Sequence, residues 1–209
     1  MLNHLFALMF FALTHIWLFH GTGWVGIALP KLTAVVGGKH SGKTTIIEHL
    51  IAELKRRGFK VGVIKEMVRI PTLDTPATET DRYTAAGAEI IVAVPRGETV
   101  VFIKKRLSIK EILPYLNEMD YVLFEGFESE KNLPKIIAAK TAGEAESYFD
   151  SSSIAVSGLI TESETETAKA ANLKIPILNG AAKTKELADL VEQKALSCRR
   201  QQKRSMNPP

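Results

Sequence analysis

Cysteine is almost absent from this sequence, because Cys198 is the only one among 209 residues. A single cysteine cannot form an intramolecular disulfide, which excludes a disulfide-bonded secreted scaffold, and we expect a cytoplasmic protein. Charge of one sign is also scarce, since the formal net charge is only +4. Part of it comes from a C-terminal run of Arg199, Arg200, Lys203 and Arg204. We interpret residues 198–209 as a solvated, disordered tail and expect no nucleic-acid partner.

Positive charge is missing from the N-terminal segment (residues 1–29), because no Lys or Arg precedes Lys31. Leu5–Phe19 is apolar apart from Thr14 and His15. A secretory signal peptide is not indicated, since it needs a positive start and a small-residue cleavage site. Three interpretations stay open: an incorrectly assigned start with the protein beginning near Leu29, a membrane anchor, or a helix packed on the domain. An anchor would still leave the following domain in the cytoplasm.

Apolar and polar residues alternate in blocks from residue 30 onward. Leu32–Val36 is a short apolar run, which predicts a buried strand. Thr44–Arg57 has apolar residues at helical spacing and is followed by Gly58, so we predict a helix that ends there. Lys60–Lys65 predicts a second strand. Strand, helix and strand in this order predict a βαβ unit with a parallel sheet.

The rest of the chain continues this alternation. Residues 69–82, rich in Thr, Pro and Asp, predict a loop. The predicted strands are Ile90–Val94 and Thr99–Lys104, which form a hairpin, and Tyr121–Phe124, Lys135–Ala139, Ile154–Ile160 and Ile175–Leu178. The predicted helices are 108–119, with Ser108 and Glu111 as a capping box, 164–171 and 183–196. We therefore expect one α/β domain over residues 30–197, with three layers, a mostly parallel sheet and a β-hairpin insertion.

The strongest chemical signal is Gly37–Thr44, which matches the pattern G-x-x-x-x-G-K-[ST]. It follows a predicted strand and opens a predicted helix, the context in which this pattern forms a phosphate-binding loop (P-loop). Its backbone N–H groups and the helix N-terminus would bind the α- and β-phosphates of a nucleotide. Lys43 would reach the β- and γ-phosphates, and the Thr44 hydroxyl would bind Mg²⁺. The predicted nucleotide-binding residues are Gly37, Gly38, Lys39, His40, Ser41, Gly42, Lys43, Thr44 and Thr45.

An acidic residue follows the apolar run Tyr121–Phe124. P-loop proteins place a carboxylate at this edge of the sheet, on the Mg²⁺ side of the nucleotide, so we predict Thr44 and Glu125 on the metal. A Ras-type Asn-Lys-x-Asp motif for the base is absent. Residues 161–162 and 179–180 follow the last two predicted strands and are the positions where we expect a base. The five histidines show no paired metal-binding spacing, so no zinc site is expected.

These motifs together resemble the molybdopterin-guanine dinucleotide biosynthesis protein B (MobB) family of P-loop proteins over residues 32–196. The resemblance rests on Lys39-His40-Ser41, Gly62–Lys65, Asp74, Pro76, Thr80, Arg82, Ala86-Gly87-Ala88, Phe124–Phe127 and Leu133–Ile136. Two sites differ from the family pattern: Glu66 and Arg69 stand where histidines are usual, and residues 77–79 replace Gly-Lys-Asp. We still expect nucleotide binding despite these differences. The residues at these two sites do not support the family's hydrolysis, or any ligand bound through the usual histidines.

The resemblance implies a GTP-binding, weakly hydrolysing accessory protein that uses Mg²⁺ and forms a homodimer. It also implies a partner, the enzyme that joins GMP to molybdopterin, called the molybdenum cofactor guanylyltransferase. Within its motifs, Lys65, Asp74, Arg82 and Lys135 are candidate ligand contacts. Two alternatives stay open at two of these positions, since Arg82 is equally interpretable as a solvated arginine and Lys135 as an ion-pair partner of Glu130.

Two other functions are compatible with the same loop. An ATP-dependent small-molecule kinase would need a lid with several arginines, whereas the arginines here are scattered. A nucleotide-gated interaction protein would bind nucleotide without turnover, with the N-terminal segment in contact with a membrane. Nucleotide binding followed by a hydrolysis assay would separate the three functions.

Overall fold

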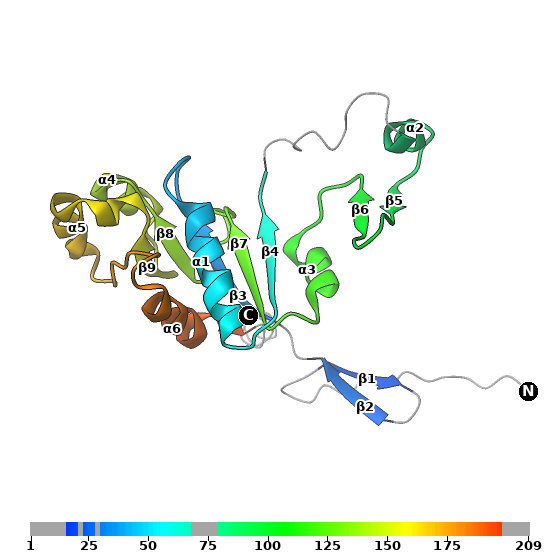
Figure 1. The fold of residues 1–209 in the computed structure, drawn as a ribbon, viewed down its shortest axis with the longest axis horizontal. Helices are drawn as coiled ribbons and strands as arrows, with labels where there is room; N and C mark the ends of the chain where they lie inside the picture. Colours follow the sequence, from blue (N-terminus) through cyan, green and yellow to red (C-terminus); the bar gives the residue numbers. More distant parts are fainter. Residues whose placement is uncertain (1–15, 21–22, 28–29, 68–78, 198–209) are drawn as a thin grey trace, which may run out of the picture. The chain divides into compact units, whose positions relative to one another are not determined.

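The computed structural model describes residues 16–20, 23–27, 30–67 and 79–197 (Figure 1). By its internal contacts the chain divides into two compact units. Unit 1 contains residues 1–66 and 116–209, and unit 2 contains residues 67–115. The candidate P-loop lies in unit 1, so the architecture of that unit positions most of the predicted site.

Unit 1 is built on a parallel sheet. Its strands are β3 (Lys31–Val36), β4 (Val61–Lys65), β7 (Tyr121–Glu125), β8 (Lys135–Ala138) and β9 (Ser153–Ser157), in the spatial order β4-β7-β3-β8-β9. All four neighbouring pairs are parallel. A short strand, β10 (Leu196–Ser197), pairs antiparallel with the start of β3. The predicted α/β fold with a mostly parallel sheet and a hairpin insertion is confirmed.

The predicted βαβ unit forms with a difference in pairing. β3 and β4 flank the helix α1 (Lys43–Arg56) in the chain, but they are not neighbours in the sheet, because β7 lies between them (Figure 1). The three strands are in register, so that Val35 and Lys65 both pair with Glu125. The pairing therefore aligns the carboxyl ends of all three strands at one edge of the sheet.

The core of unit 1 explains why these segments fold. β7 is buried over its whole length, as expected for a strand covered on both faces, and β3 is buried from Leu32 onward. Ile46, Leu50 and Leu54 lie on one side of α1 at helical spacing and belong to the same buried cluster as strand residues. Burial of this apolar surface is the main stabilising term for the unit.

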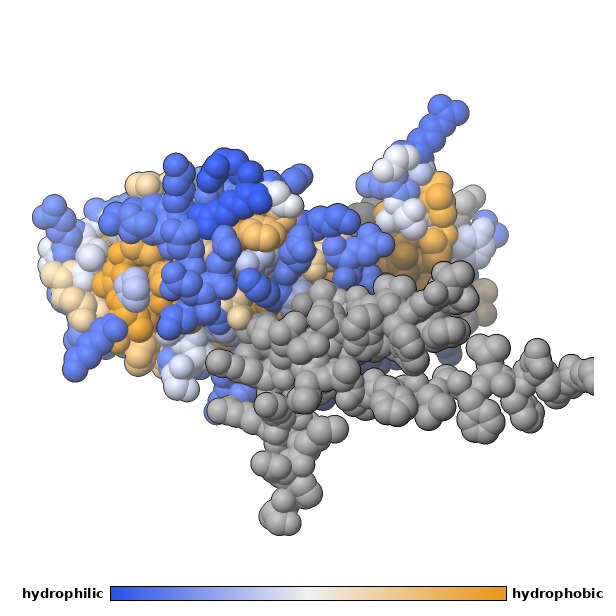
Figure 2. All heavy atoms as spheres, turned by 90° about the horizontal axis from the view of Figure 1, so that it is seen from below, coloured by the Kyte–Doolittle hydropathy of each residue, from blue (hydrophilic) through white to orange (hydrophobic). Residues whose placement is uncertain are grey.

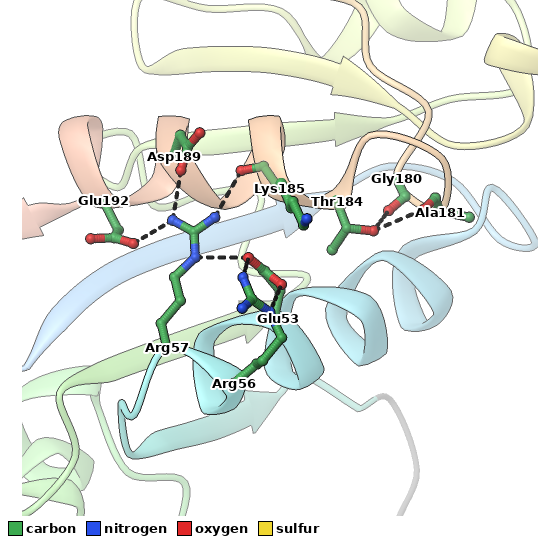
Figure 3. A network of polar contacts seen from close by, with 9 residues as sticks. All are labelled: Glu53, Arg56, Arg57, Gly180, Ala181, Thr184, Lys185, Asp189 and Glu192. Carbon is green, nitrogen blue, oxygen red and sulfur yellow. Dashed lines mark hydrogen bonds and ion pairs between the residues drawn. The ribbon is translucent and has the colours of Figure 1, made fainter.

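The C-terminal end of α1 is joined to α6 (Thr184–Lys194) by a network of charged side chains (Figure 3). Arg57 donates to Asp189 and Glu192, each at 2.6 Å, and to Glu53 at 2.9 Å. Arg56 adds two further bonds to Glu53. The hydrogen bond from Arg56, together with Arg57, lowers the pKa of Glu53 from 4.5 to about 2 although burial acts in the opposite direction. This network fixes α1 against its neighbour.

Three further parts of unit 1 depart from the sequence prediction. The strand predicted at residues 154–160 ends at Ser157, because Gly158 turns the chain at φ 90° into a 3₁₀ turn, η2 (Leu159–Glu162). The strand predicted at residues 175–178 is reduced to one bridge between Val156 and Ile177, next to Pro176, which has no N–H to donate. The helices α5 (Glu164–Ala170) and α6 confirm the predictions, whereas α4 (Ala142–Tyr148) was not predicted.

Unit 2 contains the predicted hairpin. β5 (Ile90–Ala93) pairs antiparallel with β6 (Val100–Ile103). The Ser108–Glu111 capping box is present, but α3 (Ile109–Ile112) gives way to a 3₁₀ turn, η1 (Leu113–Leu116), where Pro114 lacks the N–H that an α-helix needs, so the predicted extension to residue 119 is wrong. The helix α2 (Glu79–Ala85) overlaps the end of the predicted loop 69–82, and residues 68–78 lie outside the described residues.

Apolar side chains are exposed on this hairpin. Ile90, Val92 and Val101, which lie on one face of the ribbon, are each about half exposed. Figure 2 shows one face of the molecule, where apolar patches interrupt a mostly polar surface. An exposed apolar patch of this kind is a common property of interaction surfaces.

The N-terminal segment contains a second antiparallel hairpin, formed by β1 (Ile16–His20) and β2 (Gly23–Ile27). These residues are therefore not helical, contrary to the interpretation of the segment as a packed helix. Among the residues that the structure describes, no helix is long and apolar enough to cross a bilayer.

Candidate functional site

The predicted P-loop connects β3 to α1 with an irregular backbone. Gly37, His40 and Gly42 have positive φ angles of 140°, 57° and 96°. Gly42 is the N-cap of α1, and no side chain caps the helix there. The buried Ser41 donates from Oγ to the carbonyl of Gly38 at 2.9 Å and closes the loop on itself. Alternation of left-handed with other conformations, ending at an uncapped helix N-terminus, is the geometry of an anion-binding nest.

Lys43 turns back along the loop. Its Nζ donates to the carbonyl of Gly37 at 2.8 Å and to that of Gly38 at 2.5 Å. The ammonium group is therefore held at the first residues of the loop, although Lys43 itself begins the helix. This places a positive charge where a phosphate would enter the nest.

The ends of two strands hold the loop in position. A Cβ on Gly37 would collide with the carbonyl oxygen of Ala138, the last residue of β8, so only glycine fits. A Cβ on Gly158, which follows β9, would likewise collide with the carbonyl oxygen of Ser41. The Leu159 amide adds a long hydrogen bond of 3.4 Å to that same carbonyl. The loop is thus packed backbone against backbone.

The predicted metal residues lie together at the carboxyl edge of the sheet. Thr44 donates from Oγ1 to Oε1 of Glu125 at 3.1 Å, and Lys65 Nζ is 2.9 Å from the same oxygen. Glu125 is only 8% exposed, and Lys65 is beside it because β4 and β7 are in register. A hydroxyl and a carboxylate oxygen are ligands that Mg²⁺ accepts, so these two residues fit the ion. No group of three or more His, Cys, Asp or Glu side chains that could hold a metal ion occurs among the described residues.

The two positions predicted for a base also meet beside the loop. Thr161 donates to the carbonyl of Gly158 at 2.7 Å and accepts from Asn179 Nδ2 at 3.1 Å. The Asn179 Oδ1 in turn accepts from the amides of Ala181 and Ala182. Because Gly158 touches the P-loop, this polar link fixes the turn after β9 and the segment after residue 178 next to the N-terminal end of α1.

The other candidate residues are distributed differently. Lys39, His40 and Thr45 are exposed on the loop and the first helical turn. Arg82 is exposed on α2 in unit 2, and Asp74 lies outside the described residues.

Lys135 is 3% exposed and forms an ion pair of 2.8 Å with Asp150, while also donating to the Glu128 carbonyl. Its ion-pair partner is thus Asp150 and not the Glu130 considered from the sequence. Burial acts to raise the pKa of Asp150, but the hydrogen bonds from Lys135 and Ser152 and the charge of Lys135 together lower it. No motif marks Asp150, so sequence reasoning missed this pairing of a buried lysine with a partly exposed carboxylate.

Glu144 is a second residue that the sequence prediction did not include. It is the third residue of α4, whose N-cap Thr141 accepts from the Glu144 amide at 3.2 Å. The Glu144 carboxylate accepts from the amide of Lys140 at 2.7 Å and lies against Gly38 of the P-loop, so a Cβ on Gly38 would collide with it. The Thr-x-x-Glu spacing was a detectable helix-start signal, but contact with the loop requires the fold.

Comparisons with known proteins find relatives of this chain in sequence and in fold. A family model described as "MobB: Molybdopterin guanine dinucleotide synthesis protein B" matches residues 32–162. A putative molybdopterin-guanine dinucleotide biosynthesis adapter protein of Methanocaldococcus jannaschii is 36% identical over 115 residues, covering 53% of this chain and 47% of that protein. A probable adapter protein of Bacillus subtilis is 29% identical over 110 residues, covering 51% and 63%. The match thus spans less than two thirds of either relative.

Solved structures give the same fold. The crystal structure of Bacillus subtilis MobB has a TM-score of 0.62 at 23% identity and covers 79% of this chain and 98% of that chain. A MobB homolog from Bacillus stearothermophilus has a TM-score of 0.53 at 22% identity, with coverage of 78% and 96%.

Proposed function

Because the chain belongs to the MobB family of molybdopterin-guanine dinucleotide synthesis proteins, we propose that it is an adapter protein of that synthesis and that it binds GTP with Mg²⁺. The observation that carries the nucleotide part is the convergence of Lys43, Thr44 and Glu125 at one edge of the sheet. In this proposal the uncapped end of α1 binds the phosphates, and Lys43 neutralises their charge.

The metal follows from the same residues. Thr44 and Glu125 would hold Mg²⁺, which supplies charge neutralisation on the β- and γ-phosphates. Lys65 contacts the same Glu125 oxygen and would keep that carboxylate paired in the absence of the ion. The choice of guanine rests on the family, and the base would lie near the Thr161–Asn179 link. By the same resemblance we expect weak GTP hydrolysis, a homodimer and a molybdenum cofactor guanylyltransferase as partner.

Calorimetric titration of GTP and ATP into the wild type and a Lys43→Ala variant tests the proposal. Loss of a charge-assisted contact should weaken binding roughly ten- to a hundredfold. Lys55→Ala is the matched control, since it removes the same charge from an exposed position of the same helix. The Glu125→Gln variant is titrated with GTP once in the presence of Mg²⁺ and once in the presence of EDTA. Its loss of GTP affinity relative to the wild type should be larger with Mg²⁺ than with EDTA. Unchanged nucleotide affinity in Lys43→Ala would exclude the P-loop as the nucleotide site. Equal losses of GTP affinity with Mg²⁺ and with EDTA in Glu125→Gln would exclude a role of Glu125 on the metal.

A further inference from the structure

We propose that the negative charge of Glu144 makes the loop discriminate against the terminal phosphate of a nucleotide. The affinity for a nucleoside triphosphate, relative to that for the diphosphate, is then lower than it would be without Glu144. This inference rests on the proposed nucleotide binding and adds a residue outside the P-loop motif. Its starting observation is that a carboxylate lies directly against a loop whose expected ligand is an anion.

The contact with Gly38 is built into the fold. Glu144 is fixed at both of its ends, because its amide bonds to Thr141 and its carboxylate accepts from the Lys140 amide. The other carboxylate oxygen lies so close to the position of a Cβ on Gly38 that the two atoms would collide. Gly38 does not have a positive φ, so its backbone conformation does not demand glycine. Instead, the missing side chain leaves room for the Glu144 carboxylate.

Gly38 lies at the end of the loop expected for the terminal phosphates. The lysine of this motif reaches the β- and γ-phosphates, and here the Lys43 ammonium is bonded to the carbonyls of Gly37 and Gly38. The turn η2, whose Thr161 accepts from Asn179, adjoins Ser41 instead, nearer the other end of the loop. Glu144 therefore lies beside the residue that marks the β- and γ-phosphate end.

The charge of Glu144 is not cancelled by an ion pair among the described residues. The Lys140 ammonium donates to the Lys39 carbonyl at 3.2 Å. Tyr148 reports the same negative surroundings, since burial and then the charges of Glu128 and Glu144 raise its pKa. A partly exposed carboxylate repels an added phosphate charge by an amount that is moderate and reduced by salt. It would thus disfavour GTP more than GDP.

Titration of GTP and GDP into the Glu144→Gln variant tests this inference. Glutamine retains an acceptor for the Lys140 amide and removes only the charge, so the ratio of GTP to GDP affinity should rise about three- to tenfold and the rise should shrink at high salt. Glu146→Gln is the matched control on α4, because that side chain points to Asn172. Its ratio should equal that of the wild type.

A double variant tests the geometry. In Gly38→Ala/Glu144→Ala the added methyl occupies the space that the carboxylate leaves, so the ratio should rise as in Glu144→Gln. An unchanged or lowered ratio in Glu144→Gln would overturn the inference while wild-type binding of GTP still supports the proposed function. Failure of the wild type to bind either nucleotide would instead overturn the proposed function and this inference with it.

Discussion

The two ends of α1 are held in place by opposite means. At the N-terminal end, backbone contacts hold the helix, because glycines pack against the carbonyls of neighbouring loops and strands. No side chain caps the helix there. At the C-terminal end Arg57 joins three carboxylates from two helices. The helix is therefore anchored by charges at the end without a proposed ligand, and it keeps its N–H groups available at the end that would bind phosphate.

The comparison predicts its largest effect for Gly37→Ala. The new Cβ would collide with the backbone of Ala138, and φ is 140°, so the variant should lose roughly 3 kcal/mol of unfolding free energy. Gly58→Ala at the other end of α1 has φ 91° and open space around the Cβ. It should cost only about 1 kcal/mol. Urea unfolding measures both, and equal costs would contradict a tight backbone fit at the loop.

Arg57→Ala should have an intermediate effect. It leaves Glu53, which is 7% exposed, with a weaker set of partners, and it removes the ion pairs that join Arg57 to α6. We expect the melting temperature to fall by about 3–6 °C, with a smaller fall in 1 M salt, while the affinity for the proposed nucleotide stays unchanged. Arg56→Ala is the control, because Arg56 is 61% exposed and bonds only to Glu53 within this network. A loss of nucleotide affinity in Arg57→Ala would show that the two ends are coupled.

The smallest effect concerns pH. The hydrogen bond from Arg56 and the neighbouring Arg57 lower the pKa of Glu53 from 4.5 to about 2. A lowered carboxylate pKa stabilises the fold above the unfolded value, and this contribution is lost as pH falls through the folded value. The difference in melting temperature between the wild type and Glu53→Gln should therefore be constant above about pH 4.5 and narrow toward pH 2. A difference that narrows already between pH 7 and 5 would rule out this assignment.

Local parts of the fold and site were predictable from the sequence because their signals are contiguous. The P-loop motif lies in eight consecutive residues, Gly37–Thr44, and α1 has apolar residues at regular helical spacing. The position of Glu125 followed from a rule about strand ends, and the structure brings it to Thr44. The hairpin β5–β6 was predictable for the same reason, since two apolar runs flank a turn sequence.

The features that the sequence analysis predicted wrongly or missed depend on contacts between distant residues or on a single interrupting residue. Residues 154–160 look like one apolar strand, yet Gly158 must turn to let Ser41 approach. The pairing of Lys135 with Asp150 depends on how β8 meets the end of α4. α4 itself has small and polar residues without a clear apolar stripe, and its role beside Gly38 arises only after β8 is placed. The order of strands in the sheet is likewise not encoded in periodicity.

That strand order has a consequence for how the chain folds during synthesis. β3 is made early, yet its sheet neighbours β7, β8 and β10 all come from later in the chain, and β4 also waits for β7. The P-loop therefore emerges on a strand that has no pairing partner until residues 121–125 have been added. Such distant pairings slow folding and leave strand edges exposed in the meantime. In the proposed function, nucleotide meets the fully shaped loop only after β8 and β9 have been added, because residues at the ends of these strands pack against the loop backbone.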